Sequence, residues 1–165
     1  MGTFDDVNAI SKIAVNTHLA GAAGTVAAAV ITRLLGGKTD IVMMLNGALA
    51  GLVAITAEPL TPSPLIAIAI GAIGSLIMYF GTKFLESKKI DDVVGAIPVH
   101  MFAGIFGTLV VPLSNSGTNF GTQLTGVISV CVFSFVLSYI TFRVLKQTIG
   151  LRTVSYTHLT LPTNA

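Results

Sequence analysis

The chain has 165 residues, of which 53% are hydrophobic and only 10% are charged, and its mean hydropathy is +0.86. A soluble domain carries about 25% charged residues, so a fold this poor in charge would leave much of its apolar surface in water. The abundance of Val, Ile and Leu excludes a disordered chain, and a net charge of only +2 excludes a typical nucleic-acid binder. A single cysteine, Cys131, excludes a disulfide scaffold. Composition therefore predicts an integral membrane protein, with the lipid bilayer as its solvent.

Long stretches without Asp, Glu, Lys or Arg predict the membrane spans. A spanning helix needs about 20 predominantly apolar residues, and the longest uncharged stretch, Val93–Phe142, is long enough for two. The polar cluster Pro112–Asn119 divides that stretch, and the prolines within Glu58–Pro64 make that segment a loop. The sequence predicts an all-α, polytopic bundle of five transmembrane helices, at Asn8–Leu35, Ile41–Ala57, Pro64–Leu85, Val94–Val111 and Gly121–Thr148.

The basic residues indicate the orientation of these helices. Eight of the nine Lys and Arg residues lie in the first and third connections or at the C-terminal end, and only Lys12 lies on the opposite face. The positive-inside rule makes the basic face cytoplasmic, so we expect a cell (inner) membrane protein with a cytoplasmic C-terminus. The N-terminus would then lie outside, although Met1–Asp6 lacks the features of a signal peptide. This arrangement predicts that earlier spans precede the chain.

Small residues recur at four-residue spacing within two of the expected spans. Gly47 and Gly51 form a GxxxG pair, and Ala67, Gly71 and Ser75 form a second row. In lipid, small side chains let helices approach closely enough for van der Waals contact between backbones. We interpret these residues as packing surfaces rather than as a functional site.

The end of the chain differs in character from the rest. Val154–Thr163 matches, at every position, the translation of a transposase adapter used in sequencing libraries. Such remnants are set aside before fold reasoning. We therefore expect a native membrane domain over residues 1–153 and a non-native tail over residues 154–165, in which Tyr156 and His158 have no function.

Ionisable residues inside a membrane are energetically costly and are functional candidates. Apart from the tail, His18 and His100 are the histidines of the chain, and no acidic residue lies deep within an expected span, which disfavours a carboxylate proton relay. A neutral imidazole at His100 offers one donor and one acceptor to a small polar solute in a pore. The alternative is that His100 bridges helices through a backbone carbonyl.

His18 and Cys131 indicate a function less clearly than His100 does. For His18 we favour a hydrogen-bonded interhelical or interfacial residue over a metal or substrate ligand, and Cys131 resembles a small hydrophobic residue in an apolar helix. The sequence contains no phosphate loop, nucleophile elbow or metal-ligand cluster. It therefore indicates neither an enzyme nor a cofactor.

Four segments, in this order, resemble the Amt/Rh ammonium transporter family. Asn16–Ala23 resembles the start of the family's seventh span, Leu45–Ala57 its eighth, Ile90–His100 the entry to its tenth, and Gly150–Arg152 the end of its eleventh. The resemblance covers about residues 8–152. It implies an eleven-helix fold with two inverted repeats, usually a homotrimer with one hydrophobic pore per subunit. The chain would then be a C-terminal fragment equivalent to spans seven to eleven.

The resemblance also implies roles for three residues. His100 matches the second histidine of the family's twin-histidine pair, which would hydrogen-bond ammonia or ammonium and help to relay a proton. Leu49 and Ala96 match apolar pore-lining positions. An apolar wall would exclude hydrated potassium because the loss of its water is not compensated there. The resemblance further implies a PII-type regulatory protein as a partner on the cytoplasmic face.

The chain departs from the family in two respects. Gly95 and Ile97 replace the Asp and Phe of the motif Asp-x-Phe-x-x-His, and the first pore histidine, the recruiting aromatic residues and the phenylalanine gate would all lie in spans before this segment. We therefore expect this chain alone to be inactive in transport. A self-standing five-helix scaffold or interaction subunit is the alternative, and a proton-coupled transporter of another family is a third possibility.

Overall fold

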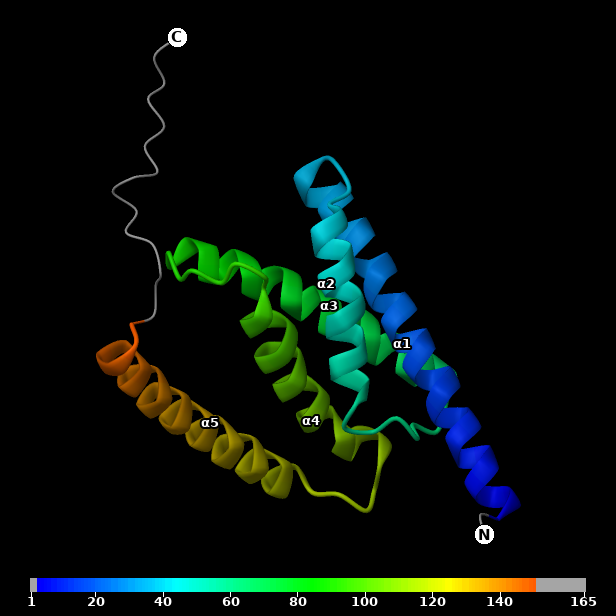
Figure 1. Cartoon of the computed structure of the whole chain (residues 1–165). Coiled ribbons are helices and arrows are strands. Elements are labelled where there is room, and N and C mark those ends of the chain that lie inside the picture. The colour runs from blue at the N-terminus through cyan, green and yellow to red at the C-terminus, as the bar shows by residue number, and fades with distance from the viewer. Residues whose placement is uncertain (1–2, 151–165) are drawn as a thin grey trace. The chain divides into compact units, whose positions relative to one another are not determined.

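The computed structural model describes residues 3–150 (Figure 1), and within that range every regular element is helical. The prediction of an all-α fold is confirmed. The π-helical turn η1 runs directly into α4, so these two elements form one continuous helix. The elements are α1 (Phe4–Gly36), α2 (Ile41–Ile55), α3 (Pro64–Ser87), η1 (Ile97–Phe102), α4 (Ala103–Ser114) and α5 (Phe120–Thr148).

Among the described residues, four helical segments are long and apolar enough to cross a membrane: α1, α3, the continuous helix Ile97–Ser114, and α5. The predicted second span is the exception, because α2 has only 15 residues. At 1.5 Å per residue it extends about 22 Å, less than the roughly 30 Å of a hydrocarbon core. The Thr56 hydroxyl donates to the Leu52 carbonyl oxygen (2.7 Å) at the end of α2, and the prolines that follow cannot continue the helix.

The start of α1 lies four residues before its predicted position at Asn8. A capping box explains the difference: the Thr3 hydroxyl accepts from the Asp6 amide (3.2 Å), and the Asp6 carboxylate accepts from the Thr3 amide (2.6 Å). These two bonds satisfy amides that would otherwise lack partners at the helix start. The helix ends before Gly37, whose φ of +73° requires a residue that tolerates the left-handed region.

The fourth predicted span, Val94–Val111, begins later than expected and opens with a π-helical turn. Pro98 explains the late start, since in an α-helix its ring would clash with the carbonyl of the fourth residue before it, Val94. The Ala103 amide then donates to the Pro98 carbonyl five residues earlier, the hydrogen bond that defines a π-helix. The predicted boundary at Val94 is therefore wrong, although the helix itself is confirmed.

The chain divides into two compact units, Met1–Thr125 and Gly126–Ala165, and each is described by itself. The first unit contains α1, α2, α3, η1 and α4. The described part of the second unit is the remainder of α5, in which the Phe135 and Tyr139 rings stack with their centroids 6.4 Å apart. Residues 151–165 lie outside the described range, so the interpretation of residues 154–165 as a non-native tail stays a prediction.

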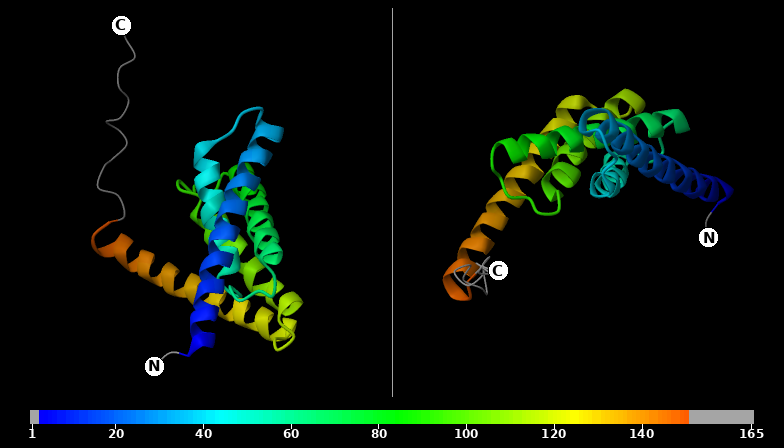
Figure 2. Two further views of the ribbon diagram at one scale, coloured as in Figure 1. Left: turned by 90° about the vertical axis from the view of Figure 1, so that its right-hand side faces the viewer. Right: turned by 90° about the horizontal axis from the view of Figure 1, so that it is seen from above.

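Helices α1, α2 and α3 pack side by side through a line of small residues (Figures 1 and 2). Gly24 of α1 lies against the backbone of Gly47 in α2, where a side chain on Gly47 would come within 2.7 Å of the Gly24 carbonyl oxygen. Gly51 and Gly71 both lie against the backbone of Ala20. Close backbone approach of this kind needs residues without bulk, as the GxxxG pair predicted. Every residue of the buried line on α1 is small or polar: Asn16, Ala20, Gly21, Gly24, Ala28 and Thr32.

A buried hydrogen bond fixes the register of this packing. The Ser75 hydroxyl of α3 donates to the Gly24 carbonyl oxygen of α1 at 2.8 Å, with Ser75 fully buried. The same packing continues into the second half of the unit, where Gly107 of α4 lies against the backbone of Ala54 in α2. The contacts therefore join α1, α2, α3 and α4.

The loop between α2 and α3 is anchored by Asn16 of α1, which is fully buried. Its Nδ2 donates to the Pro59 carbonyl oxygen (2.9 Å) and to the Thr61 hydroxyl (3.2 Å). The same loop is tied to the end of α4, since Asn115 Nδ2 donates to Glu58 Oε2 at 2.8 Å. Two amide side chains thus satisfy polar groups of a segment that has no regular structure.

The small-residue packing predicts that Gly71 and Gly36 differ in how well they tolerate a side chain. In Gly71→Ala the new methyl group would overlap the Ala20 backbone, which has no flexible end to move aside. We expect this change to lower the free energy of unfolding by about 1–3 kcal/mol in detergent micelles, measured by thermal or denaturant unfolding. Gly36→Ala is the matched control, because no atom lies within 4 Å of its Cβ position. Equal stability of the two variants would contradict the proposed packing.

Candidate functional site

The segment that carries His100 starts from a turn closed by Asp92. The Asp92 carboxylate accepts two backbone amides, from Ala96 through Oδ1 and from Ile97 through Oδ2, both at 2.9 Å. Pro98 has no amide proton, and the Val99 amide donates to the Gly95 carbonyl oxygen at 3.2 Å. The amides of Ala96, Ile97 and Val99 at the start of this helix are therefore satisfied, and the carboxylate also complements the helix dipole.

The same turn is attached to α2 through Asn46. Asn46 Nδ2 donates to the Val94 carbonyl oxygen at 3.1 Å, across 48 residues of sequence. Gly95 lies directly against this amide, with a φ of +73° and with only 2.8 Å between its Cβ position and Asn46 Nδ2. Only glycine meets both requirements without strain.

Beyond the turn, η1 packs into the first unit through two of its residues. Pro98 and Val99 are buried, and Val99 belongs to a core cluster with Ala50, Met78 and Ala103. His100 follows these buried residues and is exposed on the opposite side. The structure thus fixes the backbone on either side of His100 while its ring points out of the packed core.

The three sequence-predicted site residues lie on neighbouring elements. Leu49 is on α2 and 47% exposed, Ala96 directly precedes η1, and His100 lies within it; all three side chains are exposed in this chain. α2 packs against η1, so the structure brings these elements together. Within residues 3–150, no side-chain hydrogen bond is made by His100. The proposed bridge from His100 to a backbone carbonyl is therefore not observed in the described part of the chain.

The other two candidate residues, His18 and Cys131, lie within long helices. His18 Nδ1 is 2.7 Å from the Ala14 carbonyl oxygen of its own helix, so it is hydrogen-bonded within α1 rather than between helices. Cys131 lies in α5. Within residues 3–150, no group of three or more His, Cys, Asp or Glu side chains is placed to hold a metal ion.

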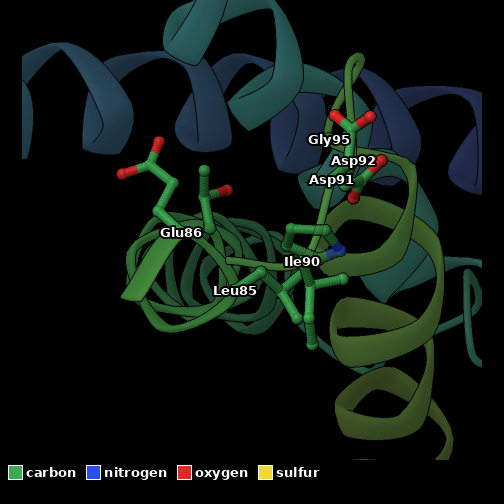
Figure 3. A pocket seen from close by; sticks show the side chains of 8 residues that line it. Leu85, Glu86, Ile90, Asp91, Asp92 and Gly95 are labelled. Carbon is green, nitrogen blue, oxygen red and sulfur yellow. The ribbon is translucent and has the colours of Figure 1, made fainter. Parts of the chain in front are cut away.

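A small pocket of about 180 Å³ lies beside the Asp92 turn, at the end of α3 (Figure 3). Two of its three acidic residues already have partners: Asp92 accepts from the backbone amides of Ala96 and Ile97, and Glu86 pairs with Lys83 at 2.9 Å. The geometry therefore describes a crevice produced by the turn rather than a ligand site. The lining residues are Thr82, Leu85, Glu86, Ile90, Asp91, Asp92, Gly95 and Pro98.

Asp92 lies within Ile90–His100, one of the segments that carry the family resemblance, but sequence reasoning assigned it no role and did not identify Asn46. A local signal existed for Asp92, since an acidic residue shortly before a helix start is a common cap. No local signal existed for Asn46, because its partner is 48 residues away.

Within residues 3–150, four helical segments are able to cross a membrane by length and composition, and those of the first unit pack with α2 through small residues, which defines a polytopic α-helical membrane protein. Comparison with known proteins gives its family. The sequence profile of the Ammonium Transporter Family matches residues 2–160 of the chain, so the chain belongs to that family.

Individual relatives agree with this assignment. The chain is 39% identical over 163 residues to Ammonium transporter Amt2 of Archaeoglobus fulgidus, covering 87% of this chain and 35% of the relative. It is 35% identical over 149 residues to Ammonium transporter Amt1 of Haloferax mediterranei, covering 87% of this chain and 29% of the relative. The chain therefore spans about a third of the length of these relatives.

Solved structures give the same fold. A structure described as a Sensor Amt Protein superposes with a TM-score of 0.81 at 33% identity, covering 88% of this chain and 39% of that chain. Candida albicans Mep2 superposes with a TM-score of 0.76 at 24% identity, over 84% of this chain and 35% of that chain. The relatives are transporters rather than enzymes, so the expectation of a non-enzyme is confirmed.

The turn closed by Asp92 predicts that Gly95 and Gly104 also differ in how well they tolerate a side chain. In Gly95→Ala, the left-handed backbone costs about 1–2 kcal/mol and the methyl group crowds Asn46 Nδ2, so we expect a lower free energy of unfolding in detergent. Gly104→Ala is the matched control on the same helix, since its Cβ would make an ordinary 3.6 Å contact with Val53. A Gly95→Ala variant as stable as Gly104→Ala would show that the turn is not constrained as described.

Proposed function

We propose that this chain forms the part of an ammonium channel that corresponds to spans seven to eleven, and that His100 lines its pore. Membership of the Ammonium Transporter Family supports this proposal over a self-standing scaffold and over a transporter of another family. In the complete protein, the ring would hydrogen-bond ammonia or ammonium and help to relay a proton. The chain's own contribution to the pore is then one histidine and an apolar wall.

One observation carries the proposal. His100 is the only ionisable residue in the membrane-crossing segment Ile97–Ser114, and its side chain is exposed on the surface of the first unit. An imidazole facing hydrocarbon without a partner would cost several kcal/mol. The face that carries His100 is therefore best explained if it lies against further protein or a pore in the complete channel. Leu49 and Ala96 are exposed on the elements that form this face.

The apolar neighbours account for selectivity in this proposal. Leu49 and Ala96 offer no oxygen ligands, so a potassium ion entering between them would lose water without compensation. Ammonium differs because it can give up a proton and cross as a neutral molecule, with His100 as the donor and acceptor. The same residues thus pass one solute and exclude the other.

Charge distribution supports the orientation. Arg33 and Lys38 lie at the junction of α1 and α2, Lys88 follows α3, and Lys146 lies in the last turn of α5. By the positive-inside rule these ends would be cytoplasmic, so the C-terminal end of α5 would lie on the cytoplasmic side of the cell (inner) membrane. The homotrimer and the PII-type partner are further parts of the proposal, supported by the family resemblance.

The role of His100 can be tested in a chimera in which residues 4–150 replace the matching segment of Amt2 from Archaeoglobus fulgidus. We expect His100→Ala to lower methylammonium uptake by about tenfold or more, because a hydrogen bond to a charged solute is lost. Uptake and membrane abundance are measured in cells that lack their own ammonium transporters. The matched control is His18→Ala, whose ring bonds to its own helix. Unchanged uptake, with unchanged selectivity against potassium, would refute the assignment of His100.

The chain by itself is predicted not to transport. The exposed face that carries Leu49, Ala96 and His100 would form only one wall of the path, so a solute would meet lipid on the other side. Ammonium flux into liposomes containing the purified chain should equal flux into empty liposomes. Saturable flux that depends on the chain would favour a self-standing transporter instead.

A further inference from the structure

The structure assigns Asp92 and Asn46 as positioning residues that aim the His100 ring, an inference that rests on the proposed function of His100. Neither residue is expected to touch the transported solute. Their contacts are all with the backbone of the turn before η1, and it is the position of that backbone that decides where the ring points.

The first argument is that nothing else in the described chain holds the ring. Within residues 3–150, the His100 imidazole makes no hydrogen bond, so the backbone of η1 decides the face on which the ring lies. A helix rotates by about 100° per residue, so a shift of one residue in the register of this turn would move the ring to another face. The bonds of η1 close five residues back where those of α4 close four residues back, so the two kinds of turn differ by such a one-residue shift.

The second argument is that Asp92 and Asn46 hold opposite sides of the same turn. Asp92 accepts the amides of Ala96 and Ile97, which fixes the first residues of the helix. Asn46 donates to the Val94 carbonyl, which fixes the residues just before it. The register of η1 is therefore set by one bond to a neighbouring helix and by two bonds within the turn.

The third argument comes from the altered sequence motif. Where the family motif has Asp, this chain has Gly95, and Gly95 is what allows Asn46 to approach the turn at 2.8 Å from the Cβ position. An Asp at this position would occupy the space of the Asn46 amide. In this chain the Asn46 amide of α2 thus takes the space that the Asp side chain of the motif would fill. The carboxylate of Asp92, three residues before Gly95, caps the helix.

The experiment uses the chimera described above, with Asp92→Ala and Asn46→Ala made singly and in the His100→Ala background. We expect each single change to lower methylammonium uptake at least about fivefold at equal membrane abundance, the size of effect that loss of a helix cap produces. In the His100→Ala background the same changes should lower the residual uptake by less than about twofold, because residues that act through His100 have nothing left to position. Asp91→Ala is the matched control, since Asp91 adjoins Asp92 and makes no hydrogen bond to the turn amides.

Asp92→Asn separates positioning from a direct effect of charge and covers the case in which the alanine variant does not fold. It keeps the shape and one accepting oxygen, so we expect a loss clearly smaller than that of Asp92→Ala. A loss as large in Asp92→Asn as in Asp92→Ala would show that an accepting oxygen at this position does not hold the turn, and it would overturn the inference.

The remaining outcomes separate this inference from the proposed function. If His100→Ala lowers uptake while the Asp92 and Asn46 variants do not, the inference fails and the role of His100 stands. Equal losses with and without His100 would also overturn it, since the two residues would then act independently of the ring. If His100→Ala leaves uptake unchanged, the proposed function fails, and the inference fails with it.

Discussion

The close backbone contact between α1, α2 and α3 is the constraint on which the rest of the structure depends. Gly24 against Gly47, and Gly51 and Gly71 against Ala20, leave no room for a side chain. In lipid, helices gain little free energy by burying apolar surface against one another, because lipid tails are apolar too. Their association therefore depends on van der Waals contact and on hydrogen bonds such as that from Ser75 to Gly24. The position of α2 follows from these contacts. Because Asn46 of α2 holds the turn before η1, the place of His100 follows from them as well.

The candidate site combines a rigid support with an open face. Pro98 and Val99 are buried against the bundle, whereas His100 between them and Phe102 is exposed. A pore-lining residue has to meet both conditions, since the solute needs access to the ring while the ring needs a fixed position. The relatives are about three times as long as the matched segment, which agrees with a site completed by other parts of a channel.

The sequence predicted those features that depend on local composition. Gaps between charges located the helices, and the spacing of Gly47 and Gly51 identified a packing face that the structure confirms. It did not predict that α2 would end at Ile55, nor the π-helical turn, because both depend on how Thr56 and Pro98 bond to backbone groups. The link from Asn46 to Val94 joins residues far apart in the chain, and no local pattern reports it. The cost of an ionisable residue within a span singled out His100, and the resemblance to the family gave it a role. The bonds of Asp92 and Asn46 to the turn before it came only from the fold.

The shortness of α2 has a consequence for the loop that follows it. Because α2 ends at Ile55 and α3 begins only at Pro64, the polar groups of the segment between them cannot all be satisfied by a helical ladder. Among these groups are the carbonyl of Pro59 and the hydroxyl of Thr61, a residue that is fully buried. Asn16 of α1 donates to both groups. A single buried amide side chain thus takes the place that water takes in an exposed turn, and it holds the chain where it passes from α2 to α3.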